Sequence, residues 1–489
     1  MNATAAAQPA PAAPLPLRLK MYHGLGSIAY GVKDNGFSTF LLLFYNQVLG
    51  MDAKLVSFAL MLALVLDAFV DPVIGYLSDQ THTRWGRRLP WLYLAPIPLA
   101  FAWFALWTPG TDGTPGFWHL VIVAVIVRSL VSCCEVPSVA LLPELTRDYD
   151  ERTALMRYRF LFGWLGGLVA TALAYGYFLK SDDPAQNGLL DPSGYSAFGL
   201  FGAAMILVST LGSALGQHRR VVALPPRPPV QRHGIAMLAD ILLAFRNPAF
   251  LALTSGALFL VTSYATSIAA TNYMMLYVWR LTDDQLAWYP AGLALAVFAA
   301  FLAVGPAHRR LGKRDTAVAA IAFGTVVGFL PYAARNLGWW IELGSWPSMA
   351  LLLSFMTVSL FGMIVATISA SSMVAEIVEA HEVEHGTRIE GVFFSGYLMT
   401  QKFGQALGIF LVGQIIALSG LGERVRPEDL APGTATGMAW TFAGAMVLIS
   451  IMSALLLRRY PIDRASHEAR LAALASTGGA AADSQGPRP

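Results

Sequence analysis

Twelve long apolar segments constrain the fold of this chain more than any other feature of its sequence. They lie at residues 24–48, 56–77, 89–107, 117–140, 157–179, 197–215, 249–276, 286–306, 316–334, 347–375, 391–418 and 436–457. A helix needs about 20 mostly apolar residues to cross a bilayer. Only 13% of the 489 residues are charged, against about 25% in a typical soluble domain. We therefore predict an all-α integral membrane protein with twelve transmembrane helices.

The positions of Lys and Arg predict the orientation of these helices. If the N-terminus is cytoplasmic, the two tails and the even-numbered loops hold 23 of the 33 Lys and Arg residues. The odd-numbered loops then hold six. Because short loops rich in Lys and Arg stay in the cytoplasm, we expect both termini on that side, in a bacterial inner membrane.

The longest polar connection divides the twelve segments into six and six. We predict a disordered tail at 1–21, a six-helix bundle at 22–216, a cytoplasmic linker at 217–247, a second bundle at 248–460 and a tail at 461–489. The stretch "GYLSDQTHTRWGRR" follows the second segment, and "GPAHRRLGKR" follows the eighth. This echo indicates an internal duplication, which is common in transporters.

Charged residues inside the expected spans mark the candidate site, because such residues are rare in membranes and usually functional. Asp67 and Asp71 are four residues apart and share a helix face. Arg128 and Glu135, seven apart, share a face of another helix. The remaining members are Lys33, Asp34, Arg159 and Lys402. We interpret the set as lining a polar cavity where carboxylates bind a cation or a proton. Structural salt bridges between helices are the alternative.

Four separated motifs resemble those of the glycoside–pentoside–hexuronide:cation symporters, a branch of the major facilitator superfamily that includes the melibiose permease. They are "GVKDNGFSTFLLLFYNQVLG", "DAFVDPVIGYLSDQTHTRWGRRLPWL", "EVPSVALLPELTRDYDERTALMRYR" and "AEIVEAHEVEHGTRIEGVFFSGYLMTQKFGQALG". The resemblance covers roughly residues 22–460. It implies the major facilitator fold of two six-helix bundles, and solute uptake driven by a gradient of H⁺, Na⁺ or Li⁺.

The resemblance also implies a role for each candidate residue. Asp67 and Asp71 would bind the coupling cation, and Glu135 would lie between the cation and the sugar. Solute binding would involve Lys33, Asp34, Glu135, Arg159 and Lys402. Ser132 lies one helical turn before Glu135 and offers a hydroxyl ligand to the cation.

Two departures from the melibiose permease affect the expected ion and solute. Val70 stands where the permease has an Asn that helps to select Na⁺. Since Val70 offers no ligand oxygen, we favour H⁺ over Na⁺ as the coupling ion. Val139 and approximately Thr367 stand where the permease has Trp residues that cover the sugar. Their loss keeps open a carrier of an amphiphilic, lysolipid-like solute. Arg128 is a third departure, because it has no counterpart in the permease. It could neutralise Asp71 or Glu135, bind an anionic solute such as a uronate, or have a purely structural role.

Charged loops at the expected cytoplasmic ends form a candidate gate. Arg84 and Arg88 follow the second span, Asp148 follows the fourth, and Glu382 and Arg388 follow the tenth. We predict that opposite charges from the two halves pair there and close the cytoplasmic side. Ordinary solvated loops are the alternative, since exposed pairs contribute at most about 1 kcal/mol.

The sequence gives little support to other classes of function. It has no Gly-rich phosphate loop, no His pattern for a metal and no Ser or Cys nucleophile set beside a His. Nor does it have an extramembrane domain large enough for a sensor. We expect no enzymatic activity, no cofactor, no metal beyond Na⁺ and no nucleic acid. The expected partners are the lipid bilayer, a small solute and the coupling cation, bound by a monomer.

Overall fold

The computed structural model describes residues 15–110, 113–146, 148–181, 186–224, 241–385 and 389–462, and these ranges contain helices and no strand. Most of both predicted tails, most of the central linker and Arg388 lie outside the described residues. Ten described helices are long and apolar enough to cross a membrane. They are α4 (Ala53–Gln80), α7 (Phe117–Ala140), α9 (Tyr149–Leu173), α10 (Pro192–Val222), α12 (Pro248–Tyr273), α14 (Tyr289–Leu311), α15 (Lys313–Asn336), α16 (Trp346–His385), α17 (Glu390–Leu418) and α18 (Thr434–Leu457).

The two remaining predicted spans are helical but divided. The first consists of α1 (Leu17–Leu25), α2 (Ile28–Asn35), the π-helical η1 (Gly36–Phe40), α3 (Leu41–Leu43) and the π-helical η2 (Phe44–Val48). The third consists of α5 (Leu89–Leu94) and α6 (Pro96–Trp107). Short helices α8 (Leu142–Leu145) and α13 (Asp283–Leu286) lie in connections. All twelve predicted spans are therefore helical, and the prediction of an all-α membrane protein is confirmed.

Helix also occupies parts of the predicted N-terminal tail and linker. Leu15 and Leu19 are buried, and Lys20 pairs with Glu151 at 3.0 Å, so α1 begins at Leu17 inside the stretch predicted as a tail. Helix α10 continues to Val222, beyond the predicted linker start at 217. Burial and an ion pair hold α1 in place, and neither can be read from local composition.

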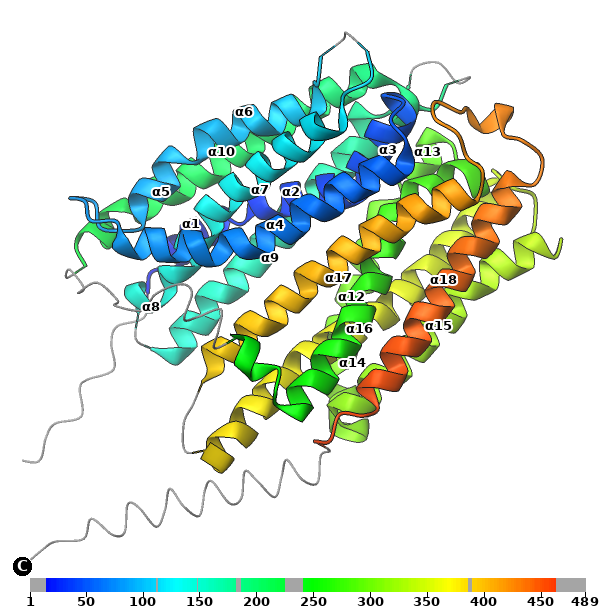
Figure 1. Cartoon of the computed structure of the whole chain (residues 1–489). Coiled ribbons are helices and arrows are strands. Elements are labelled where there is room, and N and C mark those ends of the chain that lie inside the picture. The colour runs from blue at the N-terminus through cyan, green and yellow to red at the C-terminus, as the bar shows by residue number, and fades with distance from the viewer. Residues whose placement is uncertain are drawn as a thin grey trace, which may run out of the picture.

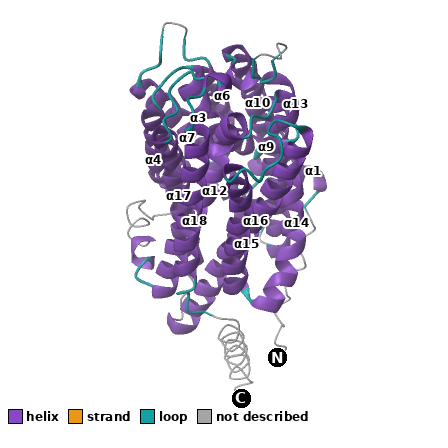
Figure 2. Cartoon of the chain, turned by 90° about the vertical axis from the view of Figure 1, so that its right-hand side faces the viewer, coloured by secondary structure: helices purple, strands orange, loops and turns teal. Residues whose placement is uncertain are grey.

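The helices form two bundles that lie side by side. The blue to teal helices of the first half lie on one side in Figure 1, and the green to red helices of the second half lie on the other. Helices α4 and α17 pack against each other across the boundary, and α12 packs against η1. The helices run lengthwise, with many of the loops gathered at one end, as Figure 2 shows. The boundary between the bundles therefore runs along α4, α17, η1 and α12.

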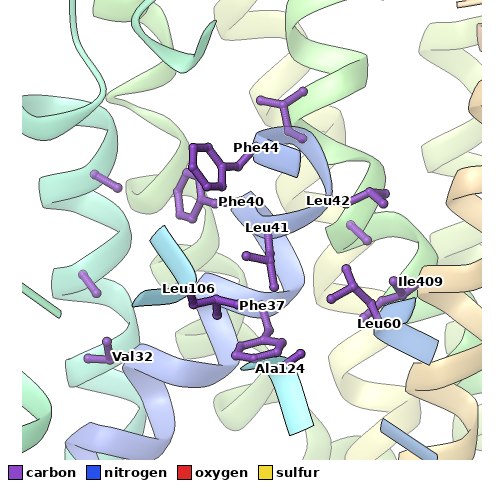
Figure 3. Packing of buried hydrophobic residues seen from close by; sticks show 14 of the residues in the cluster. Val32, Phe37, Phe40, Leu41, Leu42, Phe44, Leu60, Leu106, Ala124 and Ile409 are labelled. Atoms are coloured by element: carbon purple, nitrogen blue, oxygen red, sulfur yellow. The ribbon is translucent and has the colours of Figure 1, made fainter. Parts of the chain in front are cut away.

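One hydrophobic cluster spans both halves near the first span. Phe37, Phe40 and Phe44 of that span are buried. Leu60 of α4 and Ile409 of α17 approach each other beside them in Figure 3. Burial of one such side chain contributes about 1.5–3 kcal/mol. This cluster thus fixes α4 and α17 against each other one to two turns from Asp67.

The first and seventh spans end in the same way. Span 7 passes from α12 into the π-helical η5 (Met274–Val278), as span 1 ends in η2. The amide of Leu49 bonds the Phe44 carbonyl at 3.0 Å, and the amide of Trp279 bonds the Met274 carbonyl at 2.9 Å. Span 5 ends likewise in the π-helical η3 (Ala174–Phe178), where the amide of Leu179 bonds the Ala174 carbonyl at 2.7 Å, so three spans share this ending.

Hydrogen bonds join the two halves at this end of the molecule. The Tyr277 hydroxyl donates to Oε1 of Gln47 at 3.0 Å, and Nε2 of Gln47 donates to the Gly422 carbonyl at 2.8 Å. Asn272 donates to the Thr39 carbonyl at 2.7 Å. Three further contacts are those of Tyr273 with Asn46, Arg424 with the Leu49 carbonyl, and the Gly188 amide with Asp283. Together these contacts form a seal, which we call the outer seal.

Candidate functional site

The centre of the site is an ion cluster built from three helices. Asp67 and Asp71 lie on α4, Arg128 lies on α7, and Lys402 lies on α17. Lys402 Nζ donates to Oδ2 of Asp67 at 2.9 Å and to Oδ2 of Asp71 at 2.6 Å. Arg128 donates to the same Asp67 oxygen at 2.9 Å. Two cations therefore meet Asp67, and one of them comes from the other half of the chain.

Ser132 joins the two aspartates on the opposite side from Lys402. Its hydroxyl lies 2.6 Å from Oδ1 of Asp71 and 3.2 Å from Oδ1 of Asp67. The Asp67 side chain is 6% exposed, whereas that of Asp71 is 35% exposed. A buried carboxylate needs paired charge and hydrogen bonds, and Asp67 has both. The open side of Asp71 leaves it reachable by a small cation or a proton.

Spacing along the helices explains why these side chains meet. Asp67 and Asp71 are four residues apart on α4, and Arg128 and Ser132 are four apart on α7. Residues four apart share a helix face, so two facing pairs on packed helices make a four-residue cluster. The sequence indicated the pair Asp67 and Asp71, but it related Arg128 to Glu135 instead of Ser132. The face that α17 presents is a tertiary property.

A second cluster lies on α7 and α9. Arg159 donates to Oε1 of Glu135 and, at 2.6 Å, to the Ser138 hydroxyl. The Arg159 side chain is buried, but that of Glu135 is 30% exposed. Arg159 is thus fixed by two partners, while the free side of Glu135 can accept hydrogen bonds from a solute.

A third group lies on α2. Lys33 Nζ lies 3.6 Å from Oδ1 of Asp34 and 4.3 Å from the centre of the Tyr30 ring. Lys33 is buried, and the Asp34 side chain is 38% exposed. A carboxylate that has only one partner and is open on one side can accept charge-assisted hydrogen bonds from hydroxyl groups.

Arg128 has a different partner from the two that we considered. The sequence favoured Asp71 or Glu135, but Arg128 pairs with Asp67. It also lies 5.4 Å from the centre of the Phe37 ring. The reason is the register of α7 on α4: Ser132 lies nearest Asp71, and Arg128, one turn before Ser132, meets Asp67, which lies one turn before Asp71.

The predicted residues therefore fall into three groups, one of which is Lys33 with Asp34. Asp67, Asp71, Ser132 and Lys402 are together, although Lys402 was assigned to the solute. Glu135, assigned to both cation and solute, pairs with Arg159. Sequence reasoning missed Ser138, although its position three residues after Glu135 placed a hydroxyl on the same face.

The predicted gate residues that the structure describes lie at the opposite end from the outer seal. Arg88 bonds Asp79 and the Ser78 hydroxyl, both in its own half. Arg84 lies 5.3 Å from the Trp85 ring. Asp148 caps α9 by accepting from the Glu151 amide at 2.8 Å. Glu382 lies on α16, and Arg388 is not described.

The basic loops of the two halves make similar ion pairs. Gly86 and Gly312 both adopt positive φ, at 86° and 79°, a conformation that favours glycine. Arg87, after Gly86, pairs with Glu144 at 2.6 Å. Lys313, after Gly312, pairs with Glu376 at 3.1 Å. The echo in the sequence is therefore matched by backbone shape and by charge pairing.

Three related proteins were found by sequence comparison. An uncharacterized symporter of Synechocystis sp. is 26% identical, over 92% of this chain and 94% of its own length. The isoprimeverose transporter of Lactiplantibacillus pentosus is 26% identical, over 83% of this chain and 81% of its own. The sodium-dependent lysophosphatidylcholine symporter 1 of Mus musculus is 28% identical, but over 32% of this chain and 30% of its own. The first two are thus similar along most of the chain.

The fold is similar to that of solved transporters. The nucleoside transporter NupG has a TM-score of 0.63 at 14% identity, covering 90% of this chain and 99% of its own. At this identity the similarity shows the fold alone. Residues 22–464 match the family model described as MFS/sugar transport protein. Because this match covers most of the chain, the protein belongs to the MFS/sugar transport protein family.

Proposed function

We propose that this protein is a symporter that couples the uptake of a glycoside or another small polar solute to a gradient of H⁺ or Na⁺. The two halves would expose one shared site to each side of the membrane in turn. Family membership and the similarity to proteins named as symporters support the class. The observation that carries the proposal is the contact of Lys402, from the second half, with both Asp67 and Asp71 in the first.

This contact suggests how the ion and the halves are coupled. The ammonium of Lys402 fills the space between the two carboxylates. A proton or Na⁺ at Asp71 would compete with it, because the cation neutralises the charge that attracts the ammonium. Ion binding would then weaken the salt bridge of Lys402 between α4 and α17, and the two halves could rearrange.

H⁺ remains the favoured ion. The oxygens of Asp67, Asp71 and Ser132 lie close enough together to serve as Na⁺ ligands, but Val70 adds none. A proton needs only one acceptor, and Asp71 is exposed on one side. Na⁺ prefers a larger set of oxygens, by the same preference that governs other hard cations.

The solute would bind beside the ion cluster. Asp34 and Glu135 each have a free carboxylate side, while Lys33 and Arg159 can donate. Such a mixture suits the hydroxyl groups of a sugar, which both donate and accept. A mixture of both charge signs also disfavours a solute that carries only one.

The orientation fixes the state of the cycle that we assign to this structure. With both termini in the cytoplasm, the outer seal would face outward, and we assign the structure to an inward-facing state. We propose that Arg84, Arg88, Asp148, Glu382 and Arg388 exchange partners and pair across the halves when the protein faces outward. We expect the protein to act as a monomer, without enzymatic activity, cofactor or nucleic acid.

Uptake into proteoliposomes tests this proposal. The full chain is reconstituted, and uptake of labelled methyl glycosides is driven either by an inward pH gradient at constant Na⁺ or by an inward Na⁺ gradient at constant pH. We expect uptake under the pH gradient and loss of its gradient dependence in Asp71→Asn. Stimulation by Na⁺ alone would reject the preference for H⁺. Equal uptake with and without any gradient would reject symport.

The second candidate is a cation-coupled carrier of an amphiphilic, lysolipid-like solute. An apolar pocket inside the second bundle favours it, since such a space can hold an alkyl chain. Competition by a short-chain lysophosphatidylcholine against the methyl glycosides distinguishes the two. Uptake of the lysolipid without uptake of any glycoside would select this candidate.

A further inference from the structure

The second half contains a large pocket that none of the charged residues lines. It lies among α12, α14, α15, α16 and α18 and has an empty volume of about 990 Å³, including the space through which it opens. Binding pockets for small molecules are mostly apolar. In lining, and because five helices surround it, the pocket is therefore suited to part of a ligand.

The lining is apolar and adaptable. It includes Met274, Met356, Met363 and Met446, together with Phe442, and among the described residues no charged side chain lines it. Methionine fits irregular apolar groups because its chain is unbranched and polarizable. The pocket thus suits an aryl or alkyl group, whereas a sugar ring would lose hydrogen bonds there.

Tyr264 marks the boundary between this pocket and the charged site. It lines the pocket from α12, the helix of the second half that packs against η1 of the first half. The pocket therefore begins at a helix of the boundary between the two halves. Within the described residues, the Tyr264 hydroxyl has no hydrogen-bond partner in the protein. It is available to an oxygen of a ligand that crosses the boundary.

Tyr289 gives a second link between the pocket and the first half. It lines the pocket from α14, and its ring centre lies 6.0 Å from that of Tyr175, which belongs to the π-helical η3 (Ala174–Phe178). The pocket wall is therefore continuous with the boundary at two places, near the middle of α12 and near the outer seal.

We propose that this pocket receives the apolar aglycone of the transported glycoside, whose sugar ring binds at Asp34, Glu135 and Arg159. The solute is then a glycoside with an aryl or alkyl group instead of a free sugar. This rests on the proposed function. Polar groups of the first half would recognise the sugar, and the apolar pocket of the second half would recognise the aglycone.

The experiment compares two glycosides of one sugar. Binding of the methyl glycoside and of the 4-nitrophenyl glycoside to the purified full chain is measured by calorimetry, for glucose, galactose, xylose and glucuronic acid. Burial of an aromatic group should strengthen binding roughly tenfold to hundredfold. We expect the 4-nitrophenyl glycoside to bind at least tenfold more tightly than its methyl counterpart.

Two variants fill the pocket from different helices, each with a lipid-facing control. Met446→Trp is paired with Leu448→Trp, which is 70% exposed, and Met356→Trp with Val358→Trp, which is 39% exposed. In the pocket variants the ratio of the two affinities should fall to about one, while in the controls it should remain. Using two helices guards against one variant that fails to fold.

The outcomes separate this inference from the function on which it rests. Equal affinity for the two glycosides in the unmodified chain, with uptake of the methyl glycosides intact, would overturn the pocket proposal and keep the symporter. A preference for the 4-nitrophenyl glycoside that survives in both pocket variants would also overturn it. Absence of uptake and binding for all glycosides would reject the proposed function as well.

Discussion

The two halves share one helical plan but differ in where they keep charge. Seven of the eight candidate charges lie in the first half: Lys33, Asp34, Asp67, Asp71, Arg128, Glu135 and Arg159. The second half contributes Lys402 and a large apolar pocket. The backbone ends of spans 1 and 7 match, whereas the chemistry of the two halves differs.

This difference indicates how the work of transport is divided. The first half holds all the groups assigned to the ion and to the polar part of the solute. The second half touches the ion cluster through one ammonium, so the state of Asp71 can affect the position of α17 through Lys402. The contacts of a single side chain are easier to break and re-form than a hydrogen-bond network shared by many residues.

The largest effect should follow from Asp67→Asn. The substitution leaves Arg128 and Lys402 facing a neutral amide in a buried place, and removal of one partner from a buried ion pair costs about 3–5 kcal/mol. We expect a loss of gradient-driven uptake and a marked fall of the melting temperature in detergent. Asp71→Asn, at a more exposed position, should lose uptake with a smaller fall. An equal melting temperature for both variants would contradict the central role of Asp67.

Lys402→Met should have the next largest effect, since it removes the one charge that the second half provides. Asp67 keeps Arg128, so the protein should stay folded, with a loss of about 1–3 kcal/mol for the unmade charged hydrogen bonds. Glycoside binding should remain, while its dependence on the coupling ion should disappear. Lys180→Met, at an exposed pair with Asp284, is the control. If glycoside binding still depends on the ion in Lys402→Met, the Lys402 ammonium does not couple the ion site to the second half.

Arg159→Gln should weaken solute binding more than it lowers the stability of the fold. Glu135 loses its partner but remains 30% exposed, so water can solvate it. We expect roughly tenfold weaker glycoside binding, the equivalent of about 1.4 kcal/mol, with ion coupling retained. Binding and uptake measured on one preparation separate these effects. A proportional loss of ion dependence would place Glu135 in the ion site instead.

The smallest effect should come from the matched basic loops. Arg87→Ala and Lys313→Ala each remove a mostly buried ion pair. Glu144 keeps Arg88 and Glu376 keeps the Tyr460 hydroxyl, so each loss should be about 1 kcal/mol. The melting temperatures should fall slightly and equally, because the two loops have similar geometry. A large difference between them would show that the likeness of the loops does not extend to their energetics.

Much of the fold follows from local sequence, because a span needs about 20 apolar residues wherever it lies. The pairs Asp67 with Asp71 and Arg128 with Ser132 could likewise be read from helical spacing. The place of Lys402 could not, since it meets Asp67 across 335 residues and through the packing of two helices. Arg128 shows the same limit: spacing gave its face, but the packing of α7 on α4 chose Asp67 as its partner. The pocket could not be predicted from the sequence either, because the segments that line it have the composition of ordinary apolar helices.

The contact of Gln47 with Tyr277 bears on the speed of transport. Gln47 is bonded to Asn46, Tyr277, Gly422 and Val425, so these bonds depend on one side chain. Tyr277, Gly422 and Val425 belong to the second half, so opening the outer seal would exchange these three bonds for water together, in a concerted step with a high enthalpic barrier. The turnover number should therefore depend steeply on temperature. Cooling should slow transport by keeping the outer seal closed, while the affinity for the solute is preserved.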